Sequence, residues 1–309
     1  MIIKITNENA NRRLDKFLFA YLNNAPHSFV YKMLRKKRIK LNGKRAEGNE
    51  LLQAGDELRF FLSEETLAGC RKARIFATAK PLTGIIFEDE NLLVVDKPVG
   101  LPSQGGMKSG DHLLARVLFY LQETGAISPT ADFTPALCNR LDVNTSGLVV
   151  CGKNLHALQK MNALFAGREV KKEYLAIVHG IAGKVGESKT LTDFYRKDEK
   201  TNTAYVLPHS SSPQGGAEII TEFTVLDVSE KYSLLSVSPV TGRSHQIRVH
   251  LAHIGFPLIG DKKYGGKQTR TAPAQLLHCF KITLPCGTSW EAPPPKAFVF
   301  QRGKLECKQ

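Results

Sequence analysis

The chain has 309 residues, a net charge of +14 and a sequence pI near 9.5. This length allows two domains and a hydrophobic core that needs no disulfides. The positive charge predicts a polyanionic partner, with nucleic acid as the first candidate. No apolar run approaches the ~18 residues of a membrane-spanning helix, and the N-terminus lacks the apolar core of a signal peptide. We therefore expect a cytoplasmic protein that spans no membrane.

The first part of the chain alternates short strands with two helices. Strands are predicted at residues 2–6 and 56–62, and helices at 11–22 and 27–37. Apolar residues recur in the first helix at the spacing that keeps them on one face, namely Leu14, Phe17, Leu18, Tyr21 and Leu22.

Half of the excess positive charge lies in residues 1–62, which hold thirteen Lys or Arg against six Asp or Glu. Eight of these basic residues fall between Lys32 and Arg45, without an acid among them. A solvated helix end can look the same. However, the patterns R-L-D-K-F-L, R-K-x-R-I-K-L-N-G-K and L-x-x-G-D-E-L resemble the S-four-type RNA-binding domain, whose helix pair lies against RNA. The resemblance implies contacts to RNA phosphates by Arg12, Lys16, Lys32, Arg35, Lys36, Arg38 and Lys40.

Three regions follow from these patterns. Residues 1–62 form the small αβ RNA-binding domain, residues 63–80 show no clear period and read as a linker, and residues 81–309 form the second domain. Its strands are joined by short turns without an internal repeat, which predicts an α+β domain on a mixed, mostly antiparallel sheet. The predicted elements are strands at 85–95, 170–179, 188–207 and 217–238, helices at 112–122, 154–165 and 244–254, and a turn at 96–102.

The central stretch of the second domain is residues 137–153, LCNRLDVNTSGLVVCGK. Arg140 and Asp142 flank Leu141, and a polar turn then leads into an apolar strand. A rigid sheet edge can hold a reactive carboxylate in one geometry. The alternative is that Asp142 only caps the turn, with Arg140 as its surface partner.

The pattern R-L-D-x-x-T-S-G resembles the active-site motif of the RluA family of pseudouridine synthases, in its RluC/RluD-like branch, which isomerise uridines in structured RNA. Further matching patterns follow in order, namely K-K-E-Y-L-A from Lys171, T-G-R-S-H-Q-I-R-V-H from Thr241, G-D-K-K-Y from Gly260 and L-L-H from Leu276. Together they extend over most of the chain beyond its first fifth.

The resemblance implies a role for each matching residue. Asp142 would be the catalytic aspartate, Tyr174 the pocket tyrosine and Arg248 the arginine that pairs with the aspartate. Arg140 would lie beside the gap left by an extruded nucleotide, and Leu277 would pack in the pocket. The isomerisation needs no cofactor, because it breaks one bond and forms another without redox change.

Metal and phosphate sites are poorly supported. The six cysteines form no C-x-x-C pair, and His245, His250 and His253 are spaced so that they do not converge. Residues 265–269 lack the full spacing of a phosphate-binding loop.

The position before Arg140 is commonly histidine in the family, whereas here it is Asn139. This departure leaves open a non-catalytic RNA-binding or ribosome-assembly factor on the same scaffold. A nucleoside hydrolase would require a water-activating acid or a metal, and the sequence shows neither. We expect a monomeric synthase without a cofactor or metal, acting on RNA, with 23S ribosomal RNA favoured because of the separate RNA-binding domain.

Overall fold

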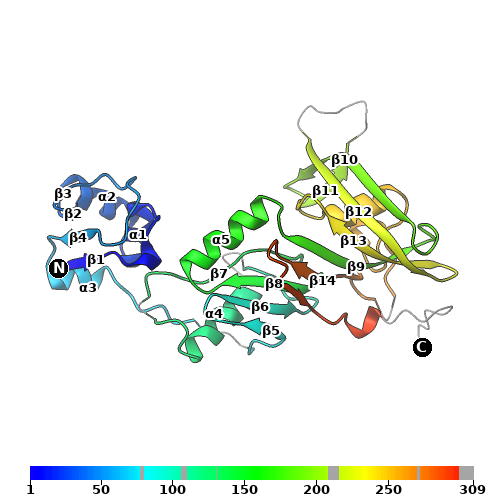
Figure 1. The fold of residues 1–309 in the computed structure, drawn as a ribbon, viewed down its shortest axis with the longest axis horizontal. Coiled ribbons are helices and arrows are strands. Elements are labelled where there is room, and N and C mark those ends of the chain that lie inside the picture. Colours follow the sequence, from blue (N-terminus) through cyan, green and yellow to red (C-terminus); the bar gives the residue numbers. More distant parts are fainter. Residues whose placement is uncertain (77–79, 106–109, 130, 208–215, 270–271, 299–309) are drawn as a thin grey trace.

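The computed structural model describes residues 1–76, 80–105, 110–129, 131–207, 216–269 and 272–298. It contains a small N-terminal body and a larger one, which lie at opposite ends of the view in Figure 1. The predicted α+β class, with a mixed and mostly antiparallel sheet in the larger body, is confirmed.

The N-terminal body is a four-stranded antiparallel sheet covered by helices. Its strands run in the order β1 (Ile2–Lys4), β4 (Glu57–Phe60), β2 (Ile39–Leu41) and β3 (Lys44–Arg45). The helices are α1 (Leu14–Tyr21) and α2 (His27–Arg35), with the short η1 (Asn7–Asn9) before them. The five apolar residues predicted to share a face of the first helix are all buried.

The stretch 63–80, predicted to be a linker, contains a further helix, α3 (Glu64–Gly69). Leu67 and Cys70 are buried in the N-terminal core. A six-residue helix is too short for a visible hydrophobic period, so no periodic signal predicted it. We propose that the N-terminal domain extends to Cys70 and that the linker begins after it.

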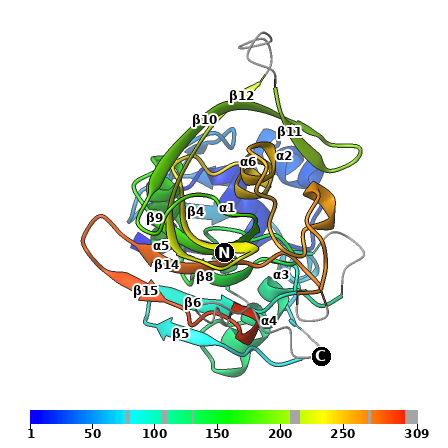
Figure 2. The same ribbon diagram turned by 90° about the vertical axis from the view of Figure 1, so that its right-hand side faces the viewer.

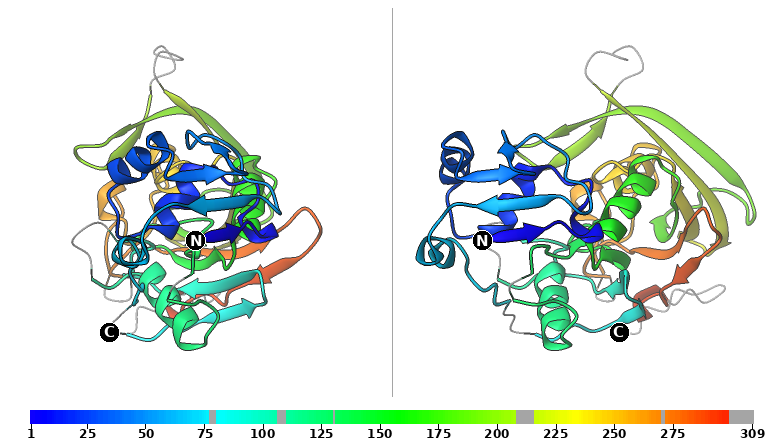
Figure 3. Two further views of the ribbon diagram at one scale, coloured as in Figure 1. Left: turned by 90° about the vertical axis from the view of Figure 1, so that its left-hand side faces the viewer. Right: turned by 60° about the vertical axis from the view of Figure 1, so that its left-hand side comes forward.

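Contacts from three arginines join the two bodies. Arg12 donates to the carbonyl of Asp132 at 3.2 Å, Arg71 lies 3.9 Å from the Asp132 carboxylate, and Arg74 donates to the Ala20 carbonyl at 3.0 Å. The backbone N–H of Arg74 also bonds to Pro129 of the larger body at 2.8 Å. Figure 3 shows the small blue sheet in two further views, in front of the larger body on the left and to one side of it on the right.

The larger body is built on an eleven-stranded sheet. The order along it is β11-β10-β12-β13-β9-β14-β8-β6-β5, with β15 beside β14 and β7 beside β8. Among the described strands, β14 and β8 form its one parallel pair. The bounds are β5 (Ile85–Glu88), β6 (Leu92–Lys97), β7 (Ala136–Leu137), β8 (Ser146–Gly152), β9 (Lys171–His179), β10 (Ser188–Asp198), β11 (Thr203–Val206), β12 (Ala217–Val228), β13 (Tyr232–Pro239), β14 (Leu277–Thr283) and β15 (Ser289–Glu291).

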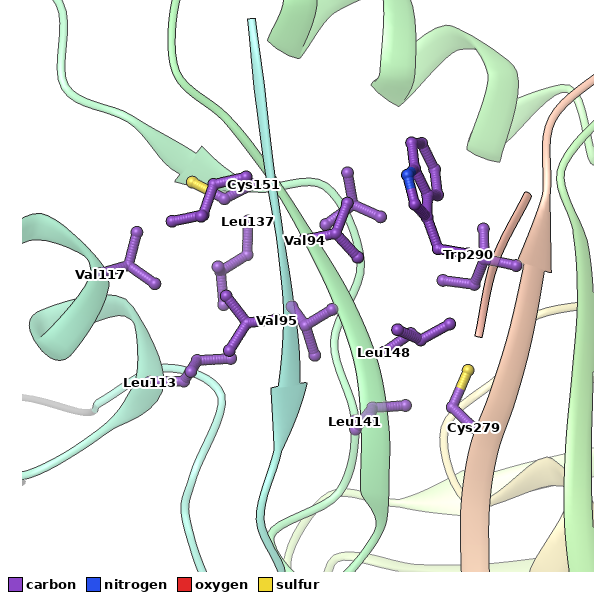
Figure 4. Packing of buried hydrophobic residues seen from close by; sticks show 14 of the residues in the cluster. Val94, Val95, Leu113, Val117, Leu137, Leu141, Leu148, Cys151, Cys279 and Trp290 are labelled. Atoms are coloured by element: carbon purple, nitrogen blue, oxygen red, sulfur yellow. The ribbon is translucent and has the colours of Figure 1, made fainter. Parts of the chain in front are cut away.

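Two helices support the half of the sheet that holds β8. They are α4 (Leu113–Glu123) and α5 (Leu155–Ala166). In Figure 4, Leu113 and Val117 of α4 face the strands on one side, while Trp290 lies on the other. β8 is buried along its whole length, which explains its continuous apolar run.

The other half of the sheet curves around one helix, α6 (Gln246–His253), as Figure 2 shows. Ile247 and Leu251 of α6 pack into the core there. Two short 3-10 turns, η3 (Lys262–Tyr264) and η4 (Lys296–Phe298), follow along the chain. The curved half thus presents α6 towards the turn that carries Asp142.

Gly147 allows the close approach of β8 and β14. A Cβ at this position would lie 2.2 Å from the carbonyl oxygen of Cys279, and the residue has φ +110°. No side chain fits in that space, so the glycine of the T-S-G pattern is required by packing.

Candidate active site

Asp142 lies in the turn between β7 and β8, and the residues just before it are held in place. The amide of Asn139 donates to the backbone of β8 at 3.2 Å and accepts from it at 2.8 Å. The backbone N–H of Leu141 donates to the Ser103 hydroxyl at 3.0 Å, and this hydroxyl donates to the Leu141 carbonyl at 2.8 Å. Asn139 thus anchors the segment that leads to Asp142.

A buried lysine holds the other side of the turn. The ammonium of Lys97 is fully enclosed and donates to the carbonyls of Pro98 at 2.9 Å, Leu101 at 2.8 Å and Val143 at 3.0 Å. Burial lowers the pKa of Lys97 to about 8, although the negative charge of Asp142 opposes this shift. Lys97 therefore ties the loop after β6 to the residue that follows Asp142.

Replacing Lys97 with Met is expected to destabilise the protein and slow turnover. Methionine fills a similar volume but donates nothing, and a buried carbonyl left without a donor costs about 1–3 kcal/mol. Urea unfolding measures the loss, and turnover should fall with it because the Val143 carbonyl is released. An unchanged unfolding midpoint would show that the three bonds do not stabilise the loop.

Arg248 of α6 connects two carboxylates. Its Nη1 donates to Asp142 Oδ2 at 2.8 Å, while Nε and Nη2 form a two-pronged bond to Asp261 at 2.7 and 2.8 Å. The side chain of Asp261 is 1% exposed, whereas that of Asp142 is 28% exposed. Burial lowers the pKa of Arg248, but the bonds and charges of Asp261 and Asp142 outweigh it and raise the pKa overall. The arginine therefore stays charged and leaves one face of Asp142 open.

A polar network holds α6 from behind. Gln246 accepts from the Thr241 hydroxyl at 2.7 Å and bonds to Thr221 of β12 at 3.0 Å. The fully buried His250 contacts Thr221 and Asp193, each at 2.9 Å. Because every member is bonded, the network fixes the position from which Arg248 projects.

Asp142, Gln246 and Arg248 line an open cavity of about 840 Å³. Asp142 is the one acid among the described residues that line it, and the ring of Tyr174 and the side chain of Leu277 form part of its wall. Burial raises the pKa of Tyr174 well above its ordinary value, so the phenol keeps its proton. The basic residues of the lining are Arg140, Lys172, Lys197, Arg243, Arg248 and Lys263.

The cavity thus brings together the five residues singled out for the second domain, with the exposed Arg140 at the rim. Two features were not predicted from the sequence, namely Asp261 as the second partner of Arg248 and the contact of His245 with Tyr264. The G-D-K-K-Y pattern contained a signal, namely an acid and a tyrosine close together outside the central motif.

Of the seven N-terminal residues predicted to bind RNA, two are partly buried and five are exposed. Lys40 is half-buried with its ammonium over the Phe61 ring, at 5.3 Å from the centroid. Arg12 turns inward to Asp132 and to the Lys16 carbonyl, so it belongs to the contact between the bodies rather than to a free surface. The other five, Lys16, Lys32, Arg35, Lys36 and Arg38, are exposed.

Comparison with known proteins identifies this arrangement. Residues 91–253 match the RNA pseudouridylate synthase family, and residues 12–58 match the S4 domain. The chain belongs to the RNA pseudouridylate synthase family. It is therefore a pseudouridine synthase, an isomerase, with an N-terminal RNA-binding domain.

Named relatives of this synthase extend over most of its length. Ribosomal large subunit pseudouridine synthase C of Vibrio cholerae is 32% identical over 88% of this chain and 83% of the relative. The protein of that name from Pasteurella multocida is 33% identical over 91% and 85%. An uncharacterized RNA pseudouridine synthase of Bacillus subtilis is 28% identical over 89% and 86%.

Solved structures agree in fold. The human RNA pseudouridylate synthase domain containing 4 superposes with a TM-score of 0.55 at 23% identity, covering 70% of this synthase and 90% of that chain. The human domain containing 1 also gives 0.55, at 22% identity, with 69% and 83% covered.

Two observations concern metals and membranes. Within the described ranges, no cluster of three or more His, Cys, Asp or Glu side chains is placed to hold a metal ion. In the same part of the synthase, no helix has the length and apolarity needed to cross a membrane.

Proposed function

We propose that this synthase isomerises uridines in large-subunit ribosomal RNA, with Asp142 as its catalytic residue and without a cofactor. The assignment of Asp142 rests on one observation. It is the single acid among the described residues that line a basic cavity, and it is paired with Arg248. The ribosomal substrate is supported by the relatives named as ribosomal large subunit pseudouridine synthases.

The reaction breaks the bond between the sugar and a base nitrogen, turns the uracil and rejoins it through a ring carbon. It requires one carboxylate near the anomeric carbon and the exclusion of water. Hydrolysis would use two carboxylates with water between them. Asp261, the second acid bonded to Arg248, is enclosed and held through both of its oxygens, which argues against release of free uracil.

Each cavity residue has a proposed part. Arg248 donates a charge-assisted hydrogen bond to Oδ2 and so holds the Asp142 carboxylate in the cavity. Tyr174 offers a flat wall for the base, with a hydroxyl that can take part in proton transfer. Arg140, exposed at the rim, can fill the gap in the RNA when the target nucleotide is flipped out, a step that costs a few kcal/mol.

Asn139 is the feature that favoured a non-catalytic assembly factor. Its amide bonds to β8 on both sides, and the turn carrying Asp142 remains anchored. This geometry supports a catalytic protein, so we do not retain the alternative.

The direct test is carbodiimide-based mapping of pseudouridine in total RNA from cells with and without this protein. We expect specific sites in large-subunit ribosomal RNA to disappear in its absence and to return with the wild-type gene. Loss of transfer RNA sites alone would correct the substrate, and loss of no site would overturn the proposal.

Neutralising exposed lysines of the N-terminal domain is expected to weaken RNA binding without loss of fold. Lys32 and Lys36 lie on the surface at the end of α2. Replacing both with Ala should lower the slope of affinity against salt by about one unit for each phosphate that is no longer neutralised. The matched control replaces the exposed Lys184 and Lys231, in loops of the larger body, and should leave the slope unchanged. Equal slopes for both variants would remove this domain from the interface.

A further inference from the structure

His245 lies between Asp142 and Tyr264 and has an unusual backbone. Its Nε2 is 3.9 Å from Asp142 Oδ2, and its Nδ1 is 2.8 Å from the Tyr264 hydroxyl. The side chain is 8% exposed, and φ is +58°, in the left-handed region. A non-glycine residue in that region costs about 1–3 kcal/mol and persists where its surroundings require it. The imidazole does not cap α6, so helix capping does not account for it.

The hydrogen bonds of Tyr264 determine which nitrogen of His245 carries the proton. The Tyr264 oxygen accepts from the backbone N–H of Ala204 at 2.9 Å. The phenol has one proton of its own, and we assign Nδ1 of His245 as its acceptor. Because Nδ1 accepts, the proton of the neutral ring lies on Nε2, the nitrogen that faces Asp142.

The charges around His245 favour this neutral form. Burial lowers its pKa; the negative Asp142 raises it, and the cations Arg248, Lys263 and Lys197 lower it further. These groups come from the turn before β8, from α6, from η3 and from β10. The ring is therefore a donor through Nε2 alone.

Arg248 and His245 both point a nitrogen towards the same oxygen of Asp142. Arg248 Nη1 bonds to Oδ2 at 2.8 Å, and His245 Nε2 faces Oδ2 at 3.9 Å. The terminal torsion of an aspartate is soft, so a single donor leaves the carboxylate able to rotate. A second donor to the same oxygen would restrict this rotation and leave Oδ1 as the free oxygen.

We propose that His245, held as its Nε2–H tautomer by Tyr264, is a positioning residue that fixes Asp142 so that Oδ1 faces the nucleotide. This assignment rests on the proposed catalytic role of Asp142. The present 3.9 Å separation is longer than a hydrogen bond, and we expect it to shorten when the nucleotide fills the cavity, as such contacts tighten in substrate complexes.

Two substitutions at His245 separate positioning from packing. Asn tolerates positive φ and reaches the place of Nδ1 but not that of Nε2, whereas Gln can put an amide N–H where Nε2 lies. His245→Asn should lower kcat roughly tenfold to a hundredfold, with KM and the unfolding midpoint little changed, because small errors of placement have effects of that size. His245→Gln should recover most of the loss.

Tyr264→Phe tests the tautomer. Phenylalanine keeps the ring that lies 5.0 Å from the Arg248 guanidinium but removes the proton donated to Nδ1. That bond favours the neutral ring, so its loss should raise the pKa of His245. Without this donor the neutral ring can carry its proton on Nδ1, which leaves Nε2 as an acceptor. The kcat should therefore fall at neutral pH and recover in part as acidification protonates Nε2.

The activity of all three variants, and of Asp142→Asn for comparison, is measured across pH as the release of tritium from the uracil carbon. Equal losses in the Asn and Gln variants, a wild-type kcat in His245→Asn, or a wild-type pH profile in Tyr264→Phe would each overturn the positioning role. An active Asp142→Asn would instead overturn the proposed function itself, so the two failures are distinguishable.

Discussion

Replacing Asp142 with Asn is expected to reduce turnover to background while RNA binding and folding remain close to the wild type. The substitution preserves shape and removes the charge. The turn is held through Asn139, Ser103 and Lys97 rather than through the carboxylate itself. Arg248 keeps both bonds to Asp261, so the free energy of unfolding should change by less than about 1 kcal/mol, as for a partly exposed pair.

The assay must follow the new bond, because substrate and product have equal mass. Forming the carbon link expels the hydrogen carried by that base carbon, so release of tritium placed there counts turnovers. Retained release by the Asn variant would refute the catalytic assignment. Loss of RNA binding together with activity would mean that the variant is misfolded or that Asp142 acts in binding.

Replacing Arg248 with Ala is expected to abolish activity and to destabilise the protein by about 3–5 kcal/mol, the usual effect of stranding one member of a buried ion pair. The stranded charge is chiefly that of Asp261, which is 1% exposed, since the Asp142 side chain still reaches solvent. Urea unfolding and tritium release measure the two effects separately.

A double variant identifies the source of the instability. If the stranded carboxylate of Asp261 is responsible, Arg248→Ala with Asp261→Asn should be more stable than Arg248→Ala alone, although still inactive. If the stability losses of the two single substitutions instead add up in the double variant, the instability of Arg248→Ala comes from the packing of α6. Arg248→Lys should remain impaired, because an ammonium cannot make the two-pronged bond to Asp261.

The fold was largely predictable because its elements carry local signals. Two patterns predict which faces are buried, namely the helical period at Leu14, Phe17 and Leu18 and the apolar run of β8. The structure confirms that these residues are buried. Helix α3 was missed because six residues are too few to show a period.

The residues of the site were predictable in part, because some of their roles depend on contacts that form only in the folded protein. Asp142, Tyr174 and Arg248 lie in recognisable patterns, and the cavity brings them together. Asp261 and His245 lie in recognisable patterns too, but the patterns do not give their roles, because these depend on spatial contacts and on an unusual φ. The inward turn of Arg12 likewise depends on Asp132, 120 residues further along the chain.

The place of β14 affects how the protein matures as it is made. This strand is inserted between β8 and β9, both of which are synthesised long before it. Until it arrives, β9 and the first residues of β8 each present an unpaired edge, and the strand after Asp142 is not joined to the strand that carries Tyr174. Such edges invite pairing with other chains, and partly folded chains of this size are aggregation-prone. We therefore expect a nascent chain to be inactive and prone to aggregation until residue 283 has left the ribosome.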